Sequence, residues 1–260
     1  MPKYIRWIGL KIRAVLHFMG VDVYPRKPGY HYVPDIYGHA AFKQIPVNDL
    51  PVFGDLASRV IQDRRSSLYY DRLHTIFQSL AHIKAQFKPS EKLNLVEVGV
   101  YKGGTSYFIA SAAKHFGLQA THHCFDTFKG HDARDIDPTV DIWHRPATFN
   151  DTHYESVKDY LSRFNNTFVF KGRFQDTCGE LHDKKIHFVH FDVDIYDPTI
   201  FGLQFFHKRL VLGGVIVVDD YGFTTCPGVQ KAVDEFIAVT PGYFSMSLLT
   251  GQYLLVKLGK

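Results

Sequence analysis

The spacing of apolar residues divides the chain near residue 88. Between Ser66 and about Gln86, apolar side chains recur at helical spacing, which predicts a helix that leads into the core. These apolar positions are Leu73, Ile76, Phe77, Leu80 and Ile83. A turn signal at residues 89–92 then precedes the first buried strand. We therefore expect an N-terminal extension over residues 1–88 and a second domain over residues 89–260.

Beyond this boundary, strand-like and helix-like segments alternate. The predicted strands span residues 93–98, 122–126, 167–171, 186–192, 215–219, 243–249 and 253–258. The predicted helices span residues 105–116, 153–164, 176–182, 198–210 and 229–239. Nearly continuous apolar strands separated by helices indicate a mostly parallel sheet that is covered on both faces. The last two strands are separated only by residues 250–252, so they should form a terminal hairpin with one reversed strand.

This arrangement resembles the class I methyltransferases. The resemblance implies a Rossmann-like α/β fold, in which a seven-stranded, mostly parallel sheet with one antiparallel strand carries helices on both faces. The extension before it would be partly helical and partly irregular, since residues 21 to about 60 are rich in Pro, Tyr, His and Gly without a sustained period.

The first twenty residues combine apolar side chains with a basic helical face formed by Lys3, Arg6, Arg13 and His17. This stretch is too short and too charged to span a bilayer, and no signal-peptide cleavage site follows it. Two interpretations are open. The helix could make a peripheral membrane contact, or its apolar side could pack on the body of the protein or on a second subunit of a homo-oligomer.

Composition narrows the class of protein. The chain has 260 residues, 45% of them hydrophobic, and a formal charge of +4 that is spread without blocks of Lys and Arg. Nucleic acid is therefore not the expected partner. The three cysteines, Cys124, Cys178 and Cys226, are far apart and form no CxxC motif. They are expected to be reduced thiols in a cytoplasmic protein, which could also associate with a membrane.

Paired carboxylates end two of the apolar strands. Asp192 and Asp194 follow one strand, and Asp219 and Asp220 follow another. The sheet should bring these side chains to one edge, which is where open α/β sheets bind ligands. Carboxylates crowded together repel one another unless a cation lies among them, and oxygen ligands favour a magnesium-like ion over zinc.

A glycine-containing turn links the first strand to a helix. Gly99 and Gly103 would let the backbone approach a ligand closely, and Thr105 or Ser106 can cap the helix. The dinucleotide fingerprint GxGxxG is absent. Asp126 ends the second strand, where a carboxylate can accept hydrogen bonds from ribose hydroxyls.

Five ordered motifs then resemble the macrocin-type O-methyltransferase family, across residues 66 to 258. They are Glu-x-Gly-x-x-x-Gly-Gly-Thr-Ser, Phe-Asp-Thr-Phe-x-Gly, Gly-Arg-Phe-Gln-Asp-Thr, Asp-x-Asp-x-Tyr and Gly-Gly-x-x-x-x-Asp-Asp-Tyr-Gly. The family acts on sugar hydroxyls of antibiotics. The resemblance implies a magnesium-dependent enzyme that moves a methyl group from S-adenosylmethionine to a hydroxyl of a glycosylated natural product or saccharide.

The resemblance also implies roles for individual residues. The methionine part of S-adenosylmethionine would be surrounded by Glu97, Gly99, Gly103, Thr105 and Ser106, and its ribose held by Asp126. The adenine would lie near Phe174, Asp176 and Thr177. Asp192, Asp219 and Asp220 would bind Mg²⁺, and Asp194 would be the general base. The family's preceding helix usually begins Thr-Met and carries an Arg six residues after the Thr; here Ser66, Ser67 and Arg72 match, so the Met is replaced.

Other interpretations remain open. A catechol-type or other small-molecule O-methyltransferase would use the same metal site, and a non-catalytic module would keep only the nucleoside pocket. His187 and His190 lie three apart on a predicted strand and do not share a face, which argues against a zinc pair. The charged segment from His131 to Thr152 is either a substrate lid or a solvated loop.

Overall fold

A seven-stranded sheet organises the part of the chain that the computed structural model describes, which is residues 50–259 together with Val15 and Met19. The strands are β1 (Leu93–Val98), β2 (Ala120–Asp126), β3 (Thr167–Lys171), β4 (Ile186–Phe191), β5 (Leu210–Val218), β6 (Tyr243–Ser247) and β7 (Tyr253–Lys257). Their order is β3-β2-β1-β4-β5-β7-β6, and only β7 runs antiparallel to its neighbours. The predicted fold class, including the terminal hairpin, is confirmed.

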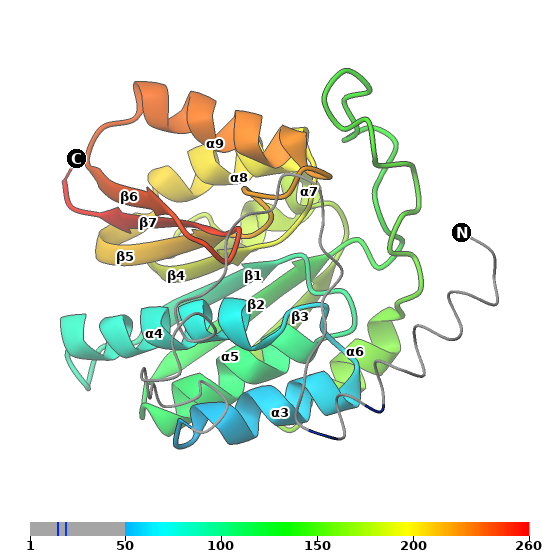
Figure 1. Cartoon of the computed structure of the whole chain (residues 1–260). Coiled ribbons are helices and arrows are strands. Elements are labelled where there is room, and N and C mark those ends of the chain that lie inside the picture. Colours follow the sequence, from blue (N-terminus) through cyan, green and yellow to red (C-terminus); the bar gives the residue numbers. More distant parts are fainter. Residues whose placement is uncertain (1–14, 16–18, 20–49, 260) are drawn as a thin grey trace. The chain divides into compact units, whose positions relative to one another are not determined.

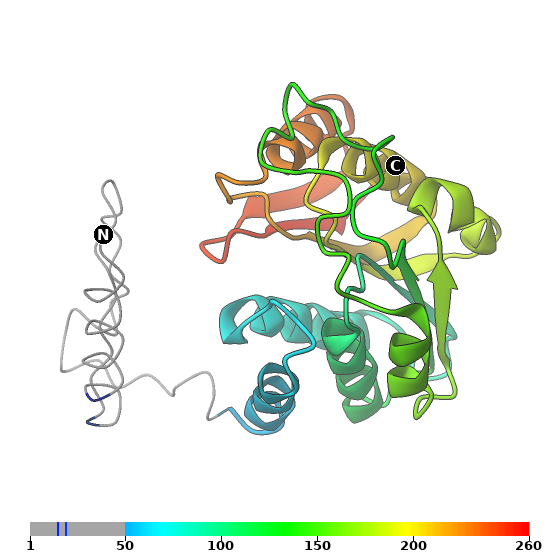
Figure 2. The same ribbon diagram turned by 90° about the vertical axis from the view of Figure 1, so that its right-hand side faces the viewer.

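Helices cover both faces of this sheet (Figures 1 and 2). One layer contains α3 (Phe53–Asp63), α4 (Tyr70–Gln86), α5 (Gly104–His115) and α6 (Tyr154–Leu161). The other contains α7 (Phe174–Thr177), the 3-10 helix η2 (Cys178–Leu181), α8 (Tyr196–His207) and α9 (Pro227–Val239). Each layer buries its own apolar cluster against the sheet, and strand residues alternate between the two clusters. The sheet therefore separates two hydrophobic cores.

The start of the described region is more regular than the sequence analysis expected. The stretch up to about residue 60 was predicted to be irregular, but α3 covers Phe53–Asp63. Phe53, Ala57 and Val60 recur along one side of this helix and are fully buried. The aromatic ring of Phe53 packs edge to face against Phe108 of α5, so α3 belongs to the same core as the strands. The predicted basic helix over residues 1–20 lies outside the described residues, apart from Val15 and Met19.

A long irregular segment over residues 127–153 connects β2 to α6 and lies beside the carboxyl ends of the strands (Figure 1). Its polar anchors are buried: the Asp141 carboxylate accepts a hydrogen bond from the Tyr196 amide at 3.1 Å, and His144 Nε2 lies 3.0 Å from the Thr225 carbonyl oxygen. These contacts give the segment one defined path over the sheet edge. Among the described helices, none is long and apolar enough to cross a membrane.

The turn after β1 depends on a glycine. Gly99 has φ 93°, and a Cβ at this position would lie 1.6 Å from the Asp192 carbonyl oxygen of the neighbouring strand. The parallel register causes this approach, because Val98 pairs with Phe191 and the next residues continue side by side. The close contact brings the β1 turn against the residue that leaves β4.

We expect Gly99→Ala to lower the free energy of unfolding by at least ~3 kcal/mol, because it adds a backbone clash to an unfavourable φ. Gly117→Ala is the matched control, since Gly117 also has a positive φ, 66°, but no atom lies within 4 Å of its added Cβ. It should cost only about 1 kcal/mol. Urea unfolding of both variants measures the difference, and equal losses would show that the clash is relieved without cost.

Candidate active site

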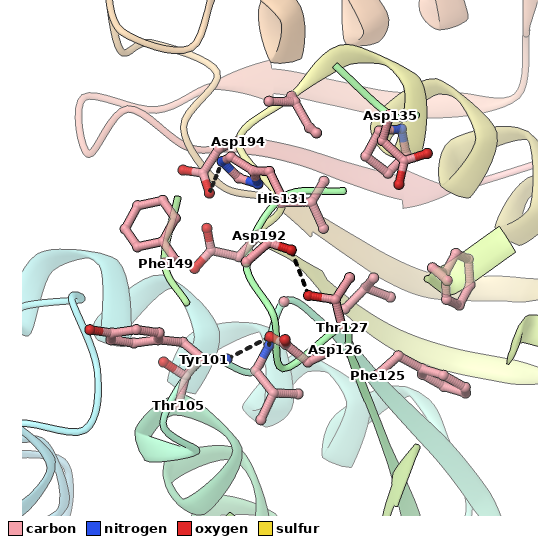
Figure 3. A pocket seen from close by; sticks show the side chains of 18 of the residues that line it. Tyr101, Thr105, Phe125, Asp126, Thr127, His131, Asp135, Phe149, Asp192 and Asp194 are labelled. Atoms are coloured by element: carbon pink, nitrogen blue, oxygen red, sulfur yellow. Dashed lines mark hydrogen bonds and ion pairs between the residues drawn. The ribbon is translucent and has the colours of Figure 1, made fainter. Parts of the chain in front are cut away.

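A cavity of about 270 Å³ opens at the carboxyl ends of β1, β2 and β4 (Figure 3). Its wall also includes the segment that precedes α4 and the irregular segment over residues 127–153. The predicted site residues that line it are Gly99, Thr105, Asp126, Phe174, Asp192, Asp194 and Asp220. The others, Glu97, Gly103, Ser106, Asp176, Thr177 and Asp219, are not part of its lining. The position of the cavity matches the expected ligand edge of the sheet.

Asp126 organises the turn at the cavity floor. Its Oδ2 accepts hydrogen bonds from the amides of Val100 and Tyr101, both at 2.8 Å, and its Oδ1 accepts one from the Phe128 amide at 2.6 Å. Burial raises the pKa of Asp126, although these three N–H groups act in the opposite direction. The carboxylate thus fixes two loops while facing the cavity.

Glu97 and Ser106 lie behind the cavity wall, and both are fully buried. The Ser106 hydroxyl donates a hydrogen bond to Glu97 Oε2, and Glu97 Oε1 lies 3.2 Å from His190 Nδ1. Burial raises the pKa of Glu97. Ser106, Glu97 and His190 therefore form a series of polar contacts beneath the edge of the sheet.

Phe174 lines one end of the cavity, but its two predicted companions do not. Asp176 is half exposed and lies 3.3 Å from Arg173, and Thr177 donates a hydrogen bond to the Arg173 carbonyl. The polar groups found there instead are Arg173 and Gln175, which both donate to the buried carboxylate of Asp135. This contact ties the 127–153 segment to the turn after β3.

Four carboxylates gather at the other end of the cavity. The backbone causes the convergence: the Asp192 amide donates to Val98 and the Asp219 amide donates to Phe191, so both residues extend the ladders of β4 and β5 by one step. Ligand atoms of Asp192 and Asp219 lie within 4.8 Å of each other, as do those of Asp194 and Asp220. Burial, followed by repulsion from the other carboxylates, raises the pKa values of Asp192 and Asp194 well above their usual range.

Arg72 of α4 supplies a positive charge to this cluster. Its Nη1 lies 2.6 Å from Asp219 Oδ2 and 3.2 Å from Asp220 Oδ1. The guanidinium partly offsets the effect of burial on Asp219, whose pKa still rises. Ser66 lies at the side of the cavity formed by the start of α5, where its hydroxyl is 2.8 Å from Thr105 Oγ1. Ser66 and Arg72, which match the family's helix motif, therefore both contact the site, although Ser67 replaces the Met of that motif.

Asp194 lies beyond the end of β4, which is at Phe191. The alternation of side chains along a strand therefore does not place Asp194 on the same side as Asp192. Asp194 stands in a tight turn with φ 64°, in which the Ile195 amide donates to the Val193 carbonyl. The turn brings its carboxylate within 4.0 Å of His131 Nε2, from the 127–153 segment (Figure 3). Burial, followed by the neighbouring His144, lowers the pKa of His131 to about 4. The segment from His131 to Thr152 thus forms one wall of the cavity.

Sequence reasoning missed His131, Asp135, Arg173 and Phe149, all of which line the cavity. Asp135 and Arg173 are 38 positions apart, and His131 belongs to a segment without periodicity. Only the charged composition of the segment signalled a role. His187 and His190 are not in one group of ligand atoms: His187 contacts Glu91 and Asn94, whereas His190 faces Glu97 and Asp219.

Residues 68–241 match the sequence profile of the family described as macrocin-O-methyltransferase (TylF). This match covers more than half of the chain. The chain belongs to the macrocin-O-methyltransferase family.

The chain is similar in sequence to two curated O-methyltransferases. It is 26% identical over 153 residues to the 8-demethyl-8-(2,3-dimethoxy-alpha-L-rhamnosyl)-tetracenomycin-C 4'-O-methyltransferase of Streptomyces olivaceus, covering 55% of this chain and 57% of that protein. It is 25% identical over 154 residues to the mycinamicin III 3''-O-methyltransferase of Micromonospora griseorubida, covering 55% and 59%. The chain thus spans less than two thirds of the relatives it matches.

Solved structures share the fold of this macrocin-O-methyltransferase family member. The O-methyltransferase NovP superposes with a TM-score of 0.65 at 21% identity, over 75% of this chain and 83% of that chain. The calicheamicin methyltransferase CalS11 superposes with a TM-score of 0.59 at 16% identity, over 83% and 95%.

Removing the guanidinium of Arg72 should destabilise the fold in a pH-dependent way. We expect Arg72→Met to lower the free energy of unfolding by roughly 3 kcal/mol at pH 8, because buried carboxylates lose their counter-charge. The folded-state pKa values of Asp192 and Asp219 already lie above those of an unfolded chain, and they should rise further. Protonation then favours the folded state, so the loss should shrink as the pH falls from 8 towards 4.

Arg134→Met is the control for this experiment, because Arg134 pairs with Asp132 on an exposed surface. It should change the free energy of unfolding little at any pH. Urea unfolding between pH 4 and pH 8 gives both profiles. A loss for Arg72→Met that does not vary with pH would contradict the electrostatic explanation.

Proposed function

We propose that the protein is a metal-dependent O-methyltransferase that moves a methyl group from S-adenosylmethionine to a hydroxyl of a sugar. The observation that carries the proposal is that one cavity has a floor around Asp126 that suits a nucleoside and, at its opposite end, the carboxylates of Asp192, Asp194 and Asp220, with Asp219 buried behind them. Family membership and the names of the two curated relatives support the reaction class and a sugar-containing acceptor. A site that held only a nucleoside would not need the acidic end.

The donor would lie along the β1 turn. Three backbone amides occupy acceptor sites of Asp126, which leaves one site on Oδ1 for a ribose hydroxyl, while Gly99 and Thr105 border the next portion of the wall. Phe174 offers an apolar surface for adenine beside Arg173 and Gln175. Glu97, Gly103 and Ser106 would then act by shaping this wall from behind, whereas Asp176 and Thr177 would hold the turn that carries Phe174.

The acidic end fits a divalent cation. Two carboxylates about 4–5 Å apart repel each other by roughly 3–4 kcal/mol at the effective dielectric of a protein. Arg72 provides one positive charge against four carboxylates, and Asp219 Oδ1 is buried without a hydrogen-bond partner. Asp192, Asp219 and Asp220 would hold an ion such as Mg²⁺, which supplies stabilisation of negative charge on the acceptor oxygen when bound.

Asp194 would act as the general base. Its carboxylate borders the cavity next to the proposed metal ligands, where it can accept the proton of a bound hydroxyl. As the acceptor oxygen forms its bond to the methyl carbon, the carbon–sulfur bond breaks and its electron pair stays on sulfur. The hydroxyl proton moves to the Asp194 carboxylate, which leaves S-adenosylhomocysteine and a methyl ether as products. The 127–153 segment would exclude water from this end.

Chelation tests the metal requirement. Methyl transfer to a panel of sugar-containing acceptors, followed as the mass gain of one methylene, should stop in EDTA and return when Mg²⁺ or Mn²⁺ is added in excess. Binding of S-adenosylhomocysteine, measured by calorimetry, should change little. Turnover that continues in EDTA would contradict the metal role, and methylation of catechols but of no sugar would favour the small-molecule alternative.

Replacing the proposed base separates it from the metal ligands. We expect Asp194→Asn to lower kcat by about 10²–10⁴-fold while the metal affinity changes only a few-fold, because general-base assistance is lost and the ligands remain. Asparagine also tolerates the positive φ of this turn. Asp183→Asn, at an exposed aspartate outside the cavity lining, is the control and should keep wild-type kcat. Equal losses of kcat and of metal affinity would make Asp194 a ligand instead.

A further inference from the structure

Two buried polar atoms face each other beside the acidic end of the cavity. His190 Nε2 and Asp219 Oδ1 are 4.0 Å apart, and neither has a hydrogen-bond partner among the residues that the structure describes. Both side chains are fully buried. Because leaving a buried polar atom unpartnered is unfavourable, two such atoms that face each other indicate a partner that both share.

The sheet register explains why they meet. Glu97 pairs with His190 across β1 and β4, and His190 pairs with Val217 across β4 and β5. Side chains two positions apart on a strand share a face, so Asp192 and Asp219, each two residues further along, follow on the same side. Ligand atoms of His190, Asp192 and Asp219 indeed lie within 4.8 Å of one another. Ligand atoms of Asp220, the third predicted ligand, lie within 4.8 Å of those of Asp194 and Cys226.

Hydrogen bonds around His190 leave its Nε2 lone pair free. Glu97 accepts from Ser106 through Oε2, so its Oε1 is the natural acceptor for His190 Nδ1–H at 3.2 Å. This assignment makes Nε2 an acceptor that faces a second acceptor, Asp219 Oδ1. A carboxylate that holds one imidazole nitrogen while the other is free is the arrangement in which proteins orient metal-binding histidines.

The Asp219 carboxylate is held so that one of its oxygens faces His190. Its Oδ2 is held by Arg72 at 2.6 Å, which leaves Oδ1 as the atom turned towards His190. The distance of 4.0 Å between His190 Nε2 and Asp219 Oδ1 is too long for a hydrogen bond between them and short enough for one bound ion to contact both. Asp192 also borders the cavity, so the remaining coordination positions would open towards the acceptor.

We propose that His190 is a metal ligand, together with Asp192 and Asp219, and that the site therefore prefers a first-row transition dication such as Mn²⁺ to Mg²⁺. The proposal rests on the metal-dependent function proposed above and changes its ligand set. An imidazole nitrogen raises affinity for transition ions, whereas Mg²⁺ is selected by oxygen ligands alone. An ordered water that donates to both His190 and Asp219 is the competing explanation, and it predicts no metal–nitrogen contact.

Pulsed electron paramagnetic resonance of bound Mn²⁺ tests the contact directly. In the full chain with unlabelled histidine, the echo modulation should show a directly coordinated ¹⁴N. Growth with ¹⁵N-histidine should convert this signal to that of ¹⁵N, without any substitution in the protein. Bound Mn²⁺ that shows no histidine coupling overturns the proposal while leaving a metal site in place. Absence of Mn²⁺ binding overturns both this proposal and the metal role in the proposed function.

Substitutions then identify which histidine supplies the nitrogen that coordinates Mn²⁺. His190→Gln should abolish the coupling and lower the Mn²⁺ affinity at least tenfold, and it should reduce the preference for Mn²⁺ over Mg²⁺. His187→Gln is the matched control, since His187 is buried on the same strand but contacts Glu91 and Asn94. It should keep the coupling and the affinity. Coupling that survives in His190→Gln, or an unchanged ratio of Mn²⁺ to Mg²⁺ affinities, would overturn the assignment.

Discussion

Repulsion among four carboxylates is the constraint around which the ligand edge of this sheet is arranged. Parallel pairing of β4 with β5 forces Asp192 and Asp219 into neighbouring positions, and tight turns then bring Asp194 and Asp220 close to them. Water cannot screen these charges well because Asp219 is fully buried. The repulsion is lowered by the positive charge of Arg72 and by protonation, which the raised pKa values of Asp192 and Asp194 favour.

Arg72 links this electrostatic requirement to the first described helices. Its helix, α4, packs on α5 and on β5, and α3 packs on the same core through Phe53. The Arg72 carbonyl also lies 3.4 Å from the fully buried Gln252 side chain at the start of β7. Elements from both ends of the described region therefore hold Arg72 in place. Packing far from the cavity thus affects the balance of charge among the carboxylates in it.

The sheet could be predicted from the sequence because its strands are apolar runs whose ends are marked by glycines and acids. The bounds of β1 and β3 agree with the prediction, and the others differ by a few residues at their ends. The helix α3 was missed, although Phe53, Ala57 and Val60 have helical spacing, because Pro51 and the preceding composition suggested irregular structure. The pairing of Arg72 with Asp219 joins residues 147 positions apart, and the Asp135–Arg173 contact depends on an aperiodic segment. No local pattern encodes either contact.

Asp194 and Asp220 both occupy left-handed backbone conformations, with φ 64° and 62°. Among non-glycine residues, asparagine and aspartate enter this region most readily, so few side chains can stand at these turns without strain. A β-branched side chain at either position would strain its turn, whereas Asn or Gly could take the place of Asp without strain in the backbone. The two turns therefore limit which side chains this edge of the sheet can present, independently of what binds there.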